Sequence, residues 1–225
     1  PGGIAAARAE VRANRDYLGR AVRWLAGEAG IRQFLDIGTG IPSDDNVHAV
    51  AQAAAPDARI VCVDSDPVVL AHAHQLLRST PEGAAAYIDG DLREPDDILA
   101  KAAETLDFSQ PVALLLLGLL YLVPDEDDPY GVVKRLVAAL PSGSYVAISH
   151  MTADFNPEMI ELMDMLNQSM AEPFTLRSRD DVARFLDGLE LVEPGLVQVN
   201  DWHPDPDAPP SGPVTAYYVG VGRKA

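Results

Sequence analysis

Short apolar runs alternate along the chain with stretches in which apolar residues recur at the spacing of an α-helix. The apolar runs predict strands at residues 31–37, 59–63, 84–88, 111–117 and 144–149. The stretches between them predict helices at 47–55, 68–78, 96–106 and 130–140. Four consecutive leucines in the run at 111–117 indicate a strand covered on both faces. Strands and helices that alternate in this way predict a parallel sheet with helices on both faces.

The two ends of the chain depart from this alternation. Residues 5–29 predict an amphipathic N-terminal helix, because their apolar residues lie on one side. This stripe consists of Val11, Leu18, Val22 and Leu25. A helical insertion is predicted at about 155–187, before two strand candidates that form a closing hairpin. They lie at 189–199, where Pro194-Gly195 breaks the strand, and at 214–221. We therefore predict a single domain over residues 1–225 with an α/β, Rossmann-like, doubly wound fold. Its mostly parallel sheet has about seven strands, and the last strand is antiparallel.

Composition and charge narrow the classes of partner. The chain has 225 residues, 48% of them hydrophobic, which suits one well-buried domain. The formal net charge of -17 repels phosphate backbones and anionic lipids, so a small molecule is expected rather than nucleic acid or a membrane. The longest uncharged apolar run, at 112–123, is shorter than the roughly 20 residues that cross a bilayer. The lone Cys62 excludes an intrachain disulfide and favours a reducing compartment, so a cytoplasmic location is expected.

A glycine turn after the first predicted strand is the first candidate binding element. Residues 36–40 read Asp-Ile-Gly-Thr-Gly, at the strand end where open α/β sheets bind ligands. Gly38 and Gly40 allow the backbone to approach a ligand closely. A dinucleotide fingerprint would require a third glycine where Ser43 stands. Asp36 suits a cationic cofactor better than a pyrophosphate, because a carboxylate attracts an ammonium group and repels a phosphate.

Acidic residues also follow the second and third predicted strands. Asp64, with Ser65 beside it, lies a little over 20 residues after the glycine turn, where a carboxylate can accept hydrogen bonds from both ribose hydroxyls. Asp66 is interpreted as the cap of the following helix. After the third strand, Asp91 is placed to accept from an adenine amino group, with Leu92 covering the ring. Three successive loops thus carry acids suited to one nucleoside ligand.

Four stretches of the sequence resemble those of a known protein family. The chain resembles class I S-adenosylmethionine-dependent methyltransferases over nearly its whole length. Within them it is similar to a bacterial group long catalogued as a domain of unknown function and named for its methyltransferase fold. The stretches that carry the resemblance are DIGTG at 36–40, VDSDPVVLAHA at 63–73, LVPD at 122–125 and GLELVEPG at 188–195.

The resemblance implies that S-adenosylmethionine is the cofactor and S-adenosylhomocysteine the product. The cofactor-binding residues that it implies are Asp36, Gly38, Thr39, Gly40, Asp64, Ser65, Asp91, Leu92 and Gly118. Asn14 and Arg15 on the first helix either reach the cofactor or form a solvated face. The loop after the fourth strand lacks the Asn/Asp-Pro-Pro-Tyr type sequence of nitrogen methylases and the acidic ligands of metal-dependent enzymes, so no metal is expected.

Candidates for catalysis are fewer. His150, directly after the fifth predicted strand, is either a general base or a hydrogen-bonded structural histidine. Tyr121 has a similar position and the same two interpretations. His48 either approaches the glycine turn or packs within a helix. The methionines of the insertion, Met159, Met163 and Met170 among them, line either an acceptor pocket or the core.

The favoured hypothesis is a methyltransferase that acts on a small-molecule acceptor. An NAD(P)-dependent oxidoreductase is the rival enzyme, and Ser43 in place of glycine argues against it. A non-catalytic regulator that binds S-adenosylmethionine is the third hypothesis, because no conspicuous catalytic group stands out. The sequence does not predict the acceptor or the oligomeric state. Trp202 in the proline-rich loop near the C-terminus is interpreted either as part of a lid or as an anchor.

Overall fold

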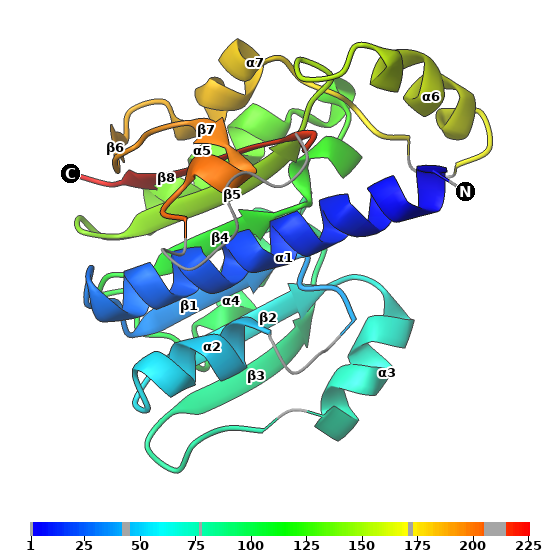
Figure 1. Cartoon of the computed structure of the whole chain (residues 1–225). Coiled ribbons are helices and arrows are strands. Elements are labelled where there is room, and N and C mark those ends of the chain that lie inside the picture. Colours follow the sequence, from blue (N-terminus) through cyan, green and yellow to red (C-terminus); the bar gives the residue numbers. More distant parts are fainter. Residues whose placement is uncertain (1, 42–45, 77, 171–172, 205–214) are drawn as a thin grey trace.

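A central sheet organises the structure, a computed structural model that describes residues 2–41, 46–76, 78–170, 173–204 and 215–225. Eight strands in this described part follow the order β3-β2-β1-β4-β5-β8-β6, and β7 also pairs with β8 (Figure 1). They are β1 (Gln33–Ile37), β2 (Arg59–Asp64), β3 (Ala84–Asp89), β4 (Ala113–Leu117), β5 (Tyr145–Met151), β6 (Glu190–Leu191), β7 (Val197–Gln198) and β8 (Tyr217–Arg223). Strands β1 to β5 are parallel, whereas β8 runs antiparallel to β5, β6 and β7. The predicted doubly wound sheet with an antiparallel final strand is confirmed.

Helices cover both faces of this sheet. They are α1 (Gly2–Gly27), α2 (Val47–Ala54), α3 (Pro67–Leu76), α4 (Pro95–Ala102), α5 (Pro129–Ala139), α6 (Glu158–Asn167) and α7 (Arg179–Ala183). Short 3-10 turns form η1 (Leu120–Leu122), η2 (Asp125–Asp127), η3 (Arg184–Leu186) and η4 (Val199–Asp201). Helices α1 and α2 pack on one face, and α4, α5 and α7 pack on the other (Figure 1). No described helix is long and apolar enough to span a membrane.

The leucine run of β4 shows why a strand without polar alternation is stable here. Ala113, Leu115 and Leu117 pack into the core beneath α1 and α2. Leu114 and Leu116 point the other way, into the core beneath α4 and α5. Because both faces of the sheet are covered, every side chain of this strand is buried, as the sequence predicted.

Several element boundaries differ from the sequence prediction. Helix α1 begins at Gly2 and ends at Gly27 rather than spanning 5–29, and Val11 in its predicted core stripe is 65% exposed. The predicted strand at 189–199 is wrong over most of its length. Only the two-residue strands β6 and β7 form, on either side of Pro194, which has no N–H for a strand ladder. The last strand is shifted two or three residues beyond its predicted range of 214–221.

Helix α1 is tied directly to the last strand of the sheet. The buried hydroxyl of Tyr17 donates to the carbonyl of Gly220 at 3.0 Å. About two helical turns closer to the N-terminus, Glu10 Oε2 accepts from the backbone N–H of Ala216 at 2.9 Å. Residues from near the two ends of the chain therefore meet on one side of the sheet (Figure 1).

Candidate active site

The sheet topology brings the predicted binding loops to one edge. Going outward from β1, the order is β2 and β3 on one side and β4 and β5 on the other. The carboxyl ends of β1 and β4 therefore diverge into loops that leave in opposite directions, which is where such sheets form ligand crevices. Asp64 ends β2 and pairs in register with Asp89 of β3, while Gly118 directly follows β4. The acids predicted on separate strands lie along the same edge.

Gly38 and Gly40 shape the turn after β1. Both have positive φ angles, +77° and +67°. The N–H of Gly38 donates to the carbonyl of Val63 at 2.9 Å, and the N–H of Gly40 donates to Asp64 Oδ2 at 2.8 Å. A Cβ on Gly38 would lie 2.8 Å from Leu119 Cδ1, whereas no atom of the residues that the structure describes lies within 4 Å of the Cβ position of Gly40. The turn is thus fastened to β2.

Asp64 lies between this turn and the start of α3. Its Oδ2 accepts from Gly40, and its Oδ1 accepts from the N–H of Asp66 at 2.9 Å. Asp66 in turn accepts from the N–H of Val68 at 2.8 Å, which confirms its predicted role at the start of the helix. Each Asp64 oxygen keeps a second lone pair for a ligand hydroxyl. Ser65 is exposed at the same edge.

Asp36 is a buried carboxylate, only 4% exposed. Burial raises its pKa to about 6; a hydrogen bond with Thr39 opposes this rise, and the charge of Asp64 adds to it. No positive group contributes to this shift. A buried carboxylate beside a second carboxylate is stabilised when a cation is supplied. The donor set at the glycine turn therefore fits a positively charged ligand, as predicted for S-adenosylmethionine.

The turn after β3 holds Asp91 and Leu92. Asp91 Oδ1 accepts from the N–H of Arg93 at 2.9 Å, and Arg93 Nε donates to Asp127 of η2 at 2.6 Å. Leu92 is buried in the core beneath α4, against residues such as Ile98. The side chain of Leu92 therefore packs inward, and its contact with an adenine ring stays a prediction. Cofactor contact through Asp91 stays a prediction.

Gly118 after β4 is reached from α1. Its φ is +68°, and its N–H donates to both the carbonyl and the hydroxyl of Ser149, at 3.2 and 2.8 Å. The Ser149 hydroxyl donates to Asn14 Oδ1 at 2.5 Å. A Cβ on Gly118 would lie 2.9 Å from Asn14 Nδ2 and 3.6 Å from the hydroxyl of Tyr121. Of the two interpretations of Asn14, the structure excludes a merely solvated helix face.

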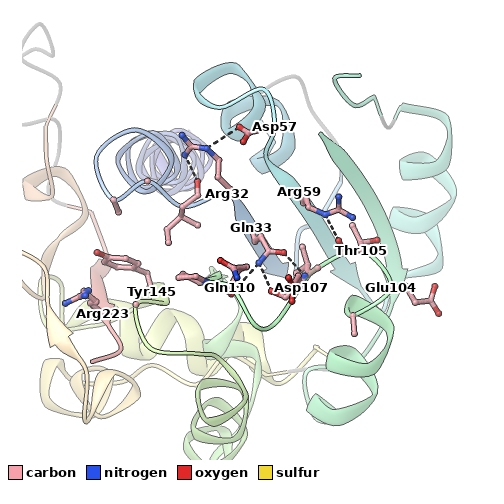
Figure 2. Close-up of a pocket in the computed structure, with 17 residues that line it drawn as sticks. Arg32, Gln33, Asp57, Arg59, Glu104, Thr105, Asp107, Gln110, Tyr145 and Arg223 are labelled. Atoms are coloured by element: carbon pink, nitrogen blue, oxygen red, sulfur yellow. Dashed lines mark hydrogen bonds and ion pairs between the residues drawn. The ribbon is translucent and has the colours of Figure 1, made fainter. Parts of the chain in front are cut away.

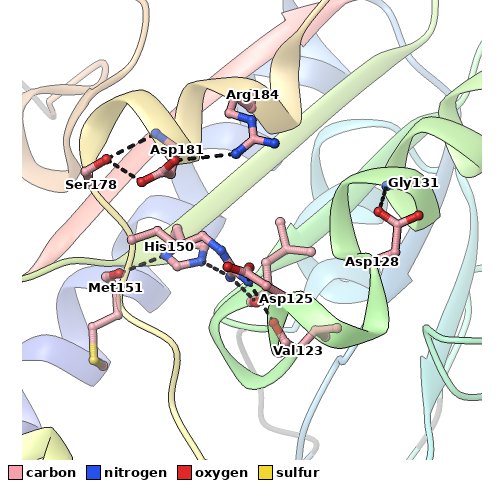
Figure 3. A network of polar contacts seen from close by, with 11 residues as sticks. Val123, Asp125, Asp128, Gly131, His150, Met151, Ser178, Asp181 and Arg184 are labelled. Carbon is pink, nitrogen blue, oxygen red and sulfur yellow. Dashed lines mark hydrogen bonds and ion pairs between the residues drawn. The ribbon is translucent and has the colours of Figure 1, made fainter.

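His150, the predicted base, lies in a closed network (Figure 3). Its Nε2 lies 3.0 Å from a guanidinium nitrogen of Arg177, and its Nδ1 lies 2.7 Å from the carbonyl of Met151. Because arginine only donates, Nε2 accepts and Nδ1 carries the proton. Burial lowers the pKa of His150 to about 4, and the charge of Arg177 lowers it further. With both ring nitrogens engaged and no exposed surface, His150 fits the structural interpretation better than the role of base.

Arg177 is a functional candidate that the sequence did not reveal. It is buried, and its guanidinium donates to the carbonyls of Leu120 and Val123, both at 2.9 Å, and to Asp125 Oδ1 at 2.6 Å. These contacts fasten the loop after β4 to the end of β5. No local signal marked this arginine, because it lies in a stretch with other polar residues and its partners lie 27 to 57 residues earlier.

The burial of His150 predicts a loss of stability in acid. A histidine with a lowered pKa stabilises the fold above its unfolded pKa of about 6.5, and that contribution is lost as the pH falls towards the folded value near 4. Between pH 7 and 4.5 this amounts to about 2 kcal/mol of unfolding free energy. Protonation of Asp36 stabilises the fold over the same pH range and would mask this loss. We therefore expect the loss to be measurable in the Asp36→Asn variant, which lacks that titrating carboxyl group. Urea denaturation at each pH measures it.

The matched variant is the double substitution Asp36→Asn with His150→Gln. It removes the titrating imidazole, so its unfolding free energy should no longer fall by this amount between pH 7 and 4.5. An equal fall in the single and double variants would show that His150 is not the group responsible.

A cavity lies at the opposite edge of the sheet (Figure 2). It has a volume of about 780 Å³ and is lined by residues at the amino ends of the parallel strands. Its polar groups are largely satisfied within the protein: Arg32 pairs with Asp57 at 3.2 Å, and Gln33 Nε2 donates to the carbonyl of Asp107 at 2.8 Å. None of the predicted site residues lines this cavity. A smaller cavity of about 330 Å³ lies at the carboxyl edge, next to α6.

Other predicted residues have structural positions. His48 is buried on α2, with its ring centroid 6.5 Å from that of Tyr87, which supports the helix-packing interpretation. Trp202 is fully buried against Tyr17, so it anchors the core and does not form a lid. Of the methionines of the insertion, Met163 on α6 is buried, whereas Met170, which lies beyond the end of α6, is exposed. The side chain of Met159 and residue Ser43 lie outside the described part of the structure.

The structure also places Cys62 and Tyr121, two residues whose side chains bear on catalysis. Cys62 is buried in β2, and burial raises the pKa of its thiol, an effect to which the charge of Asp36 adds. The thiol is therefore a poor nucleophile, as its position in the sequence indicated. The hydroxyl of Tyr121 lies 3.5 Å from that of Tyr217, near Gly118, and remains a candidate for acceptor contact.

Together, the fold and this edge define a Rossmann-like α/β protein whose crevice suits a nucleoside with a positive charge. The model of the S-adenosyl methyltransferase family matches residues 3–225. The chain belongs to this family and is an S-adenosylmethionine-dependent methyltransferase.

Solved structures agree with this assignment. A DUF574 family protein from Streptomyces avermitilis shares 47% identity at a TM-score of 0.93, over 98% of this chain and 86% of that one. A candidate methyltransferase from Thermobifida fusca shares 37% identity at a TM-score of 0.89, over 97% and 83%. Human N-acetylserotonin methyltransferase, solved with S-adenosylmethionine, shares the fold at 13% identity and a TM-score of 0.54, over 92% and 51%. No curated protein gave a significant match.

Proposed function

We propose that the chain binds S-adenosylmethionine along the carboxyl edge of β1 to β4, transfers its methyl group to a small-molecule acceptor and releases S-adenosylhomocysteine. The observation that carries this proposal is the buried carboxylate of Asp36, whose pKa is raised by burial and by the charge of Asp64 and which no positive group stabilises among the causes of that shift. The family of the chain supports the reaction, and the negative net charge of -17 supports a small acceptor rather than nucleic acid. The lone, buried Cys62 supports the predicted cytoplasmic location.

Each element of the edge has a distinct task in this proposal. Asp36 and the backbone of the glycine turn hold the charged end of the cofactor, and Asp64 holds its ribose. Asp91 faces the adenine, and the backbone at Gly118 borders the amino-acid portion. S-adenosylmethionine supplies a methyl group bonded to a positively charged sulfur. Because methyl transfer is an in-line displacement, the protein contributes mainly by aligning the acceptor and excluding water.

The structure offers no strong general base at this edge among the described residues. His150 has both ring nitrogens engaged, and the thiol of Cys62 is buried. An acceptor that ionises readily, or one that needs no deprotonation before transfer, suits such a site.

Asp64→Ala tests the cofactor site. Loss of a charged acceptor for two ribose hydroxyls should weaken S-adenosylhomocysteine binding by about 10- to 100-fold, the equivalent of roughly 1.5–3 kcal/mol. Isothermal titration calorimetry measures the affinity. Asp57→Ala is the matched control, because Asp57 lies in the cavity at the opposite edge and should not change it. Unchanged affinity in Asp64→Ala would remove this residue from the site.

Turnover separates an enzyme from a regulator. A regulator would bind S-adenosylmethionine but never yield S-adenosylhomocysteine with any acceptor. Product detection by mass spectrometry across a panel of small acceptors therefore tests the catalytic half of the proposal.

A further inference from the structure

The cavity of about 330 Å³ beside α6 lies at the same edge of the sheet as the cofactor residues. Its floor is formed just after β5, by Ala153 and Asp154, and its roof by α6. Four apolar side chains line it: Ile160, Met163, Phe174 and Leu176. This volume is near the lower end of the range of small-molecule pockets.

Aromatic contacts connect this cavity to the cofactor edge. The ring of Phe174, in the cavity wall, packs edge-on against Tyr121 with centroids 5.3 Å apart. The hydroxyl end of Tyr121 lies near Gly118, 3.6 Å from the position of a Cβ there. Two adjoining rings therefore span the distance from the cavity to the turn that ends β4.

The charged side chains around the cavity differ in whether they have hydrogen-bond or ion-pair partners. The guanidinium of Arg177, which lines it, is taken up by two carbonyls, by Asp125 and by His150. Asp154 Oδ2 accepts from the N–H of Arg179 and from the hydroxyl of Tyr218. Asp164 on α6 has no hydrogen-bond or ion-pair partner among the described residues. The carboxylate of Asp164 thus has no partner among the described residues, and it lines a cavity of mixed polar and apolar character whose only positive side chain, Arg177, is already paired.

We propose that this cavity is the subsite for the methyl acceptor, and that the acceptor has an apolar body with an ammonium or guanidinium group directed at Asp164. This inference rests on the proposed function and adds the chemical class of the substrate. The apolar walls hold the body by burial, and the carboxylate selects against anionic and neutral molecules of the same shape.

Three probes of equal shape and different charge test the class. They are 2-phenylethylamine, 2-phenylethanol and 3-phenylpropanoate, titrated into protein saturated with S-adenosylhomocysteine and followed by ligand-observed NMR. We expect the amine to bind about fivefold more tightly than the alcohol, in line with one partly solvated ion pair, and the carboxylate not to bind. Equal binding of amine and alcohol, or no binding of any probe, would overturn the inference.

Matched variants on α6 locate the site. Asp164→Asn should abolish the preference for the amine, whereas Glu161→Gln, an exposed acid on the same helix outside the cavity, should keep it. Ile160→Lys places a cation at the cavity and should abolish amine binding. Met165→Lys is its control, because Met165 is 67% exposed and does not line the cavity. A preference that survives in Asp164→Asn would show that the probe binds elsewhere.

The same titrations distinguish the two proposals. S-adenosylhomocysteine should bind all four variants as it binds the wild type. If it fails to bind the wild type, the proposed function is wrong. If it binds and the amine shows no preference, only the acceptor subsite is wrong.

Discussion

Asp36→Asn should stabilise the unliganded protein and weaken its binding of S-adenosylmethionine. The folded-state pKa of Asp36 is raised to about 6, so near neutral pH the fold must accommodate a buried charge that the unfolded chain keeps in water. An amide removes this charge, and the unfolding free energy at pH 7 should rise by up to about 3 kcal/mol. Urea denaturation measures the gain. Asp57→Asn, in an exposed ion pair, is the control and should change stability by less than about 1 kcal/mol.

The same residue predicts how cofactor binding depends on pH. Asp36 stabilises the unliganded fold in its protonated form, and this contribution is lost as the pH rises through about 6. A cationic cofactor requires the ionised form, so affinity should increase about tenfold between pH 5 and 7, with release of a proton on binding. Calorimetry in buffers of different ionisation enthalpy detects that proton. If Asp36→Asn keeps the wild-type pH dependence, another group controls binding.

Arg177→Met should cost about 4 kcal/mol of unfolding free energy. Methionine fills much of the same volume but leaves three buried acceptors without a donor: the carbonyls of Leu120 and Val123, and Nε2 of His150. Each costs about 1–2 kcal/mol. The ion pair with Asp125 contributes little to this sum, because the Asp125 side chain is 72% exposed.

Asp125→Asn is therefore the comparison that separates the two parts of the network. It removes the exposed half of the ion pair and should cost less than about 1 kcal/mol by urea denaturation. Similar losses in Arg177→Met and Asp125→Asn would mean that the ion pair, and not the backbone carbonyls, accounts for the stability. Arg177→Lys should lie close to Arg177→Met, because one ammonium cannot reach both carbonyls and the imidazole in the planar arrangement of a guanidinium.

The sequence predicted those features that depend on neighbouring residues. The alternation of strands and helices follows from local periodicity. Because parallel strands end at one edge of a sheet, Asp36, Asp64 and Gly118 could be assigned to the same edge from the sequence alone. Asp66 at the start of α3 was predictable for the same reason, because its partner is two residues away.

Features that depend on distant residues were not predictable in this way. Arg177 is held by groups 27 to 57 residues away, and Asn14 bonds to Ser149 across 135 positions. No local pattern distinguishes these polar residues from solvated ones. The outward side chain of Val11 was misjudged because burial is decided by which element lies opposite, and periodicity does not identify that element.

The bonds from α1 to β8 have a consequence for the order in which the protein matures. The partners of Tyr17 and Glu10 lie about 200 residues later in the chain, so they leave the ribosome long after α1. Until then the first helix has no β8 to pack against, and Asn14 is not yet fixed beside Gly118. A nascent chain is therefore expected to become competent for its cofactor only after β8 has emerged.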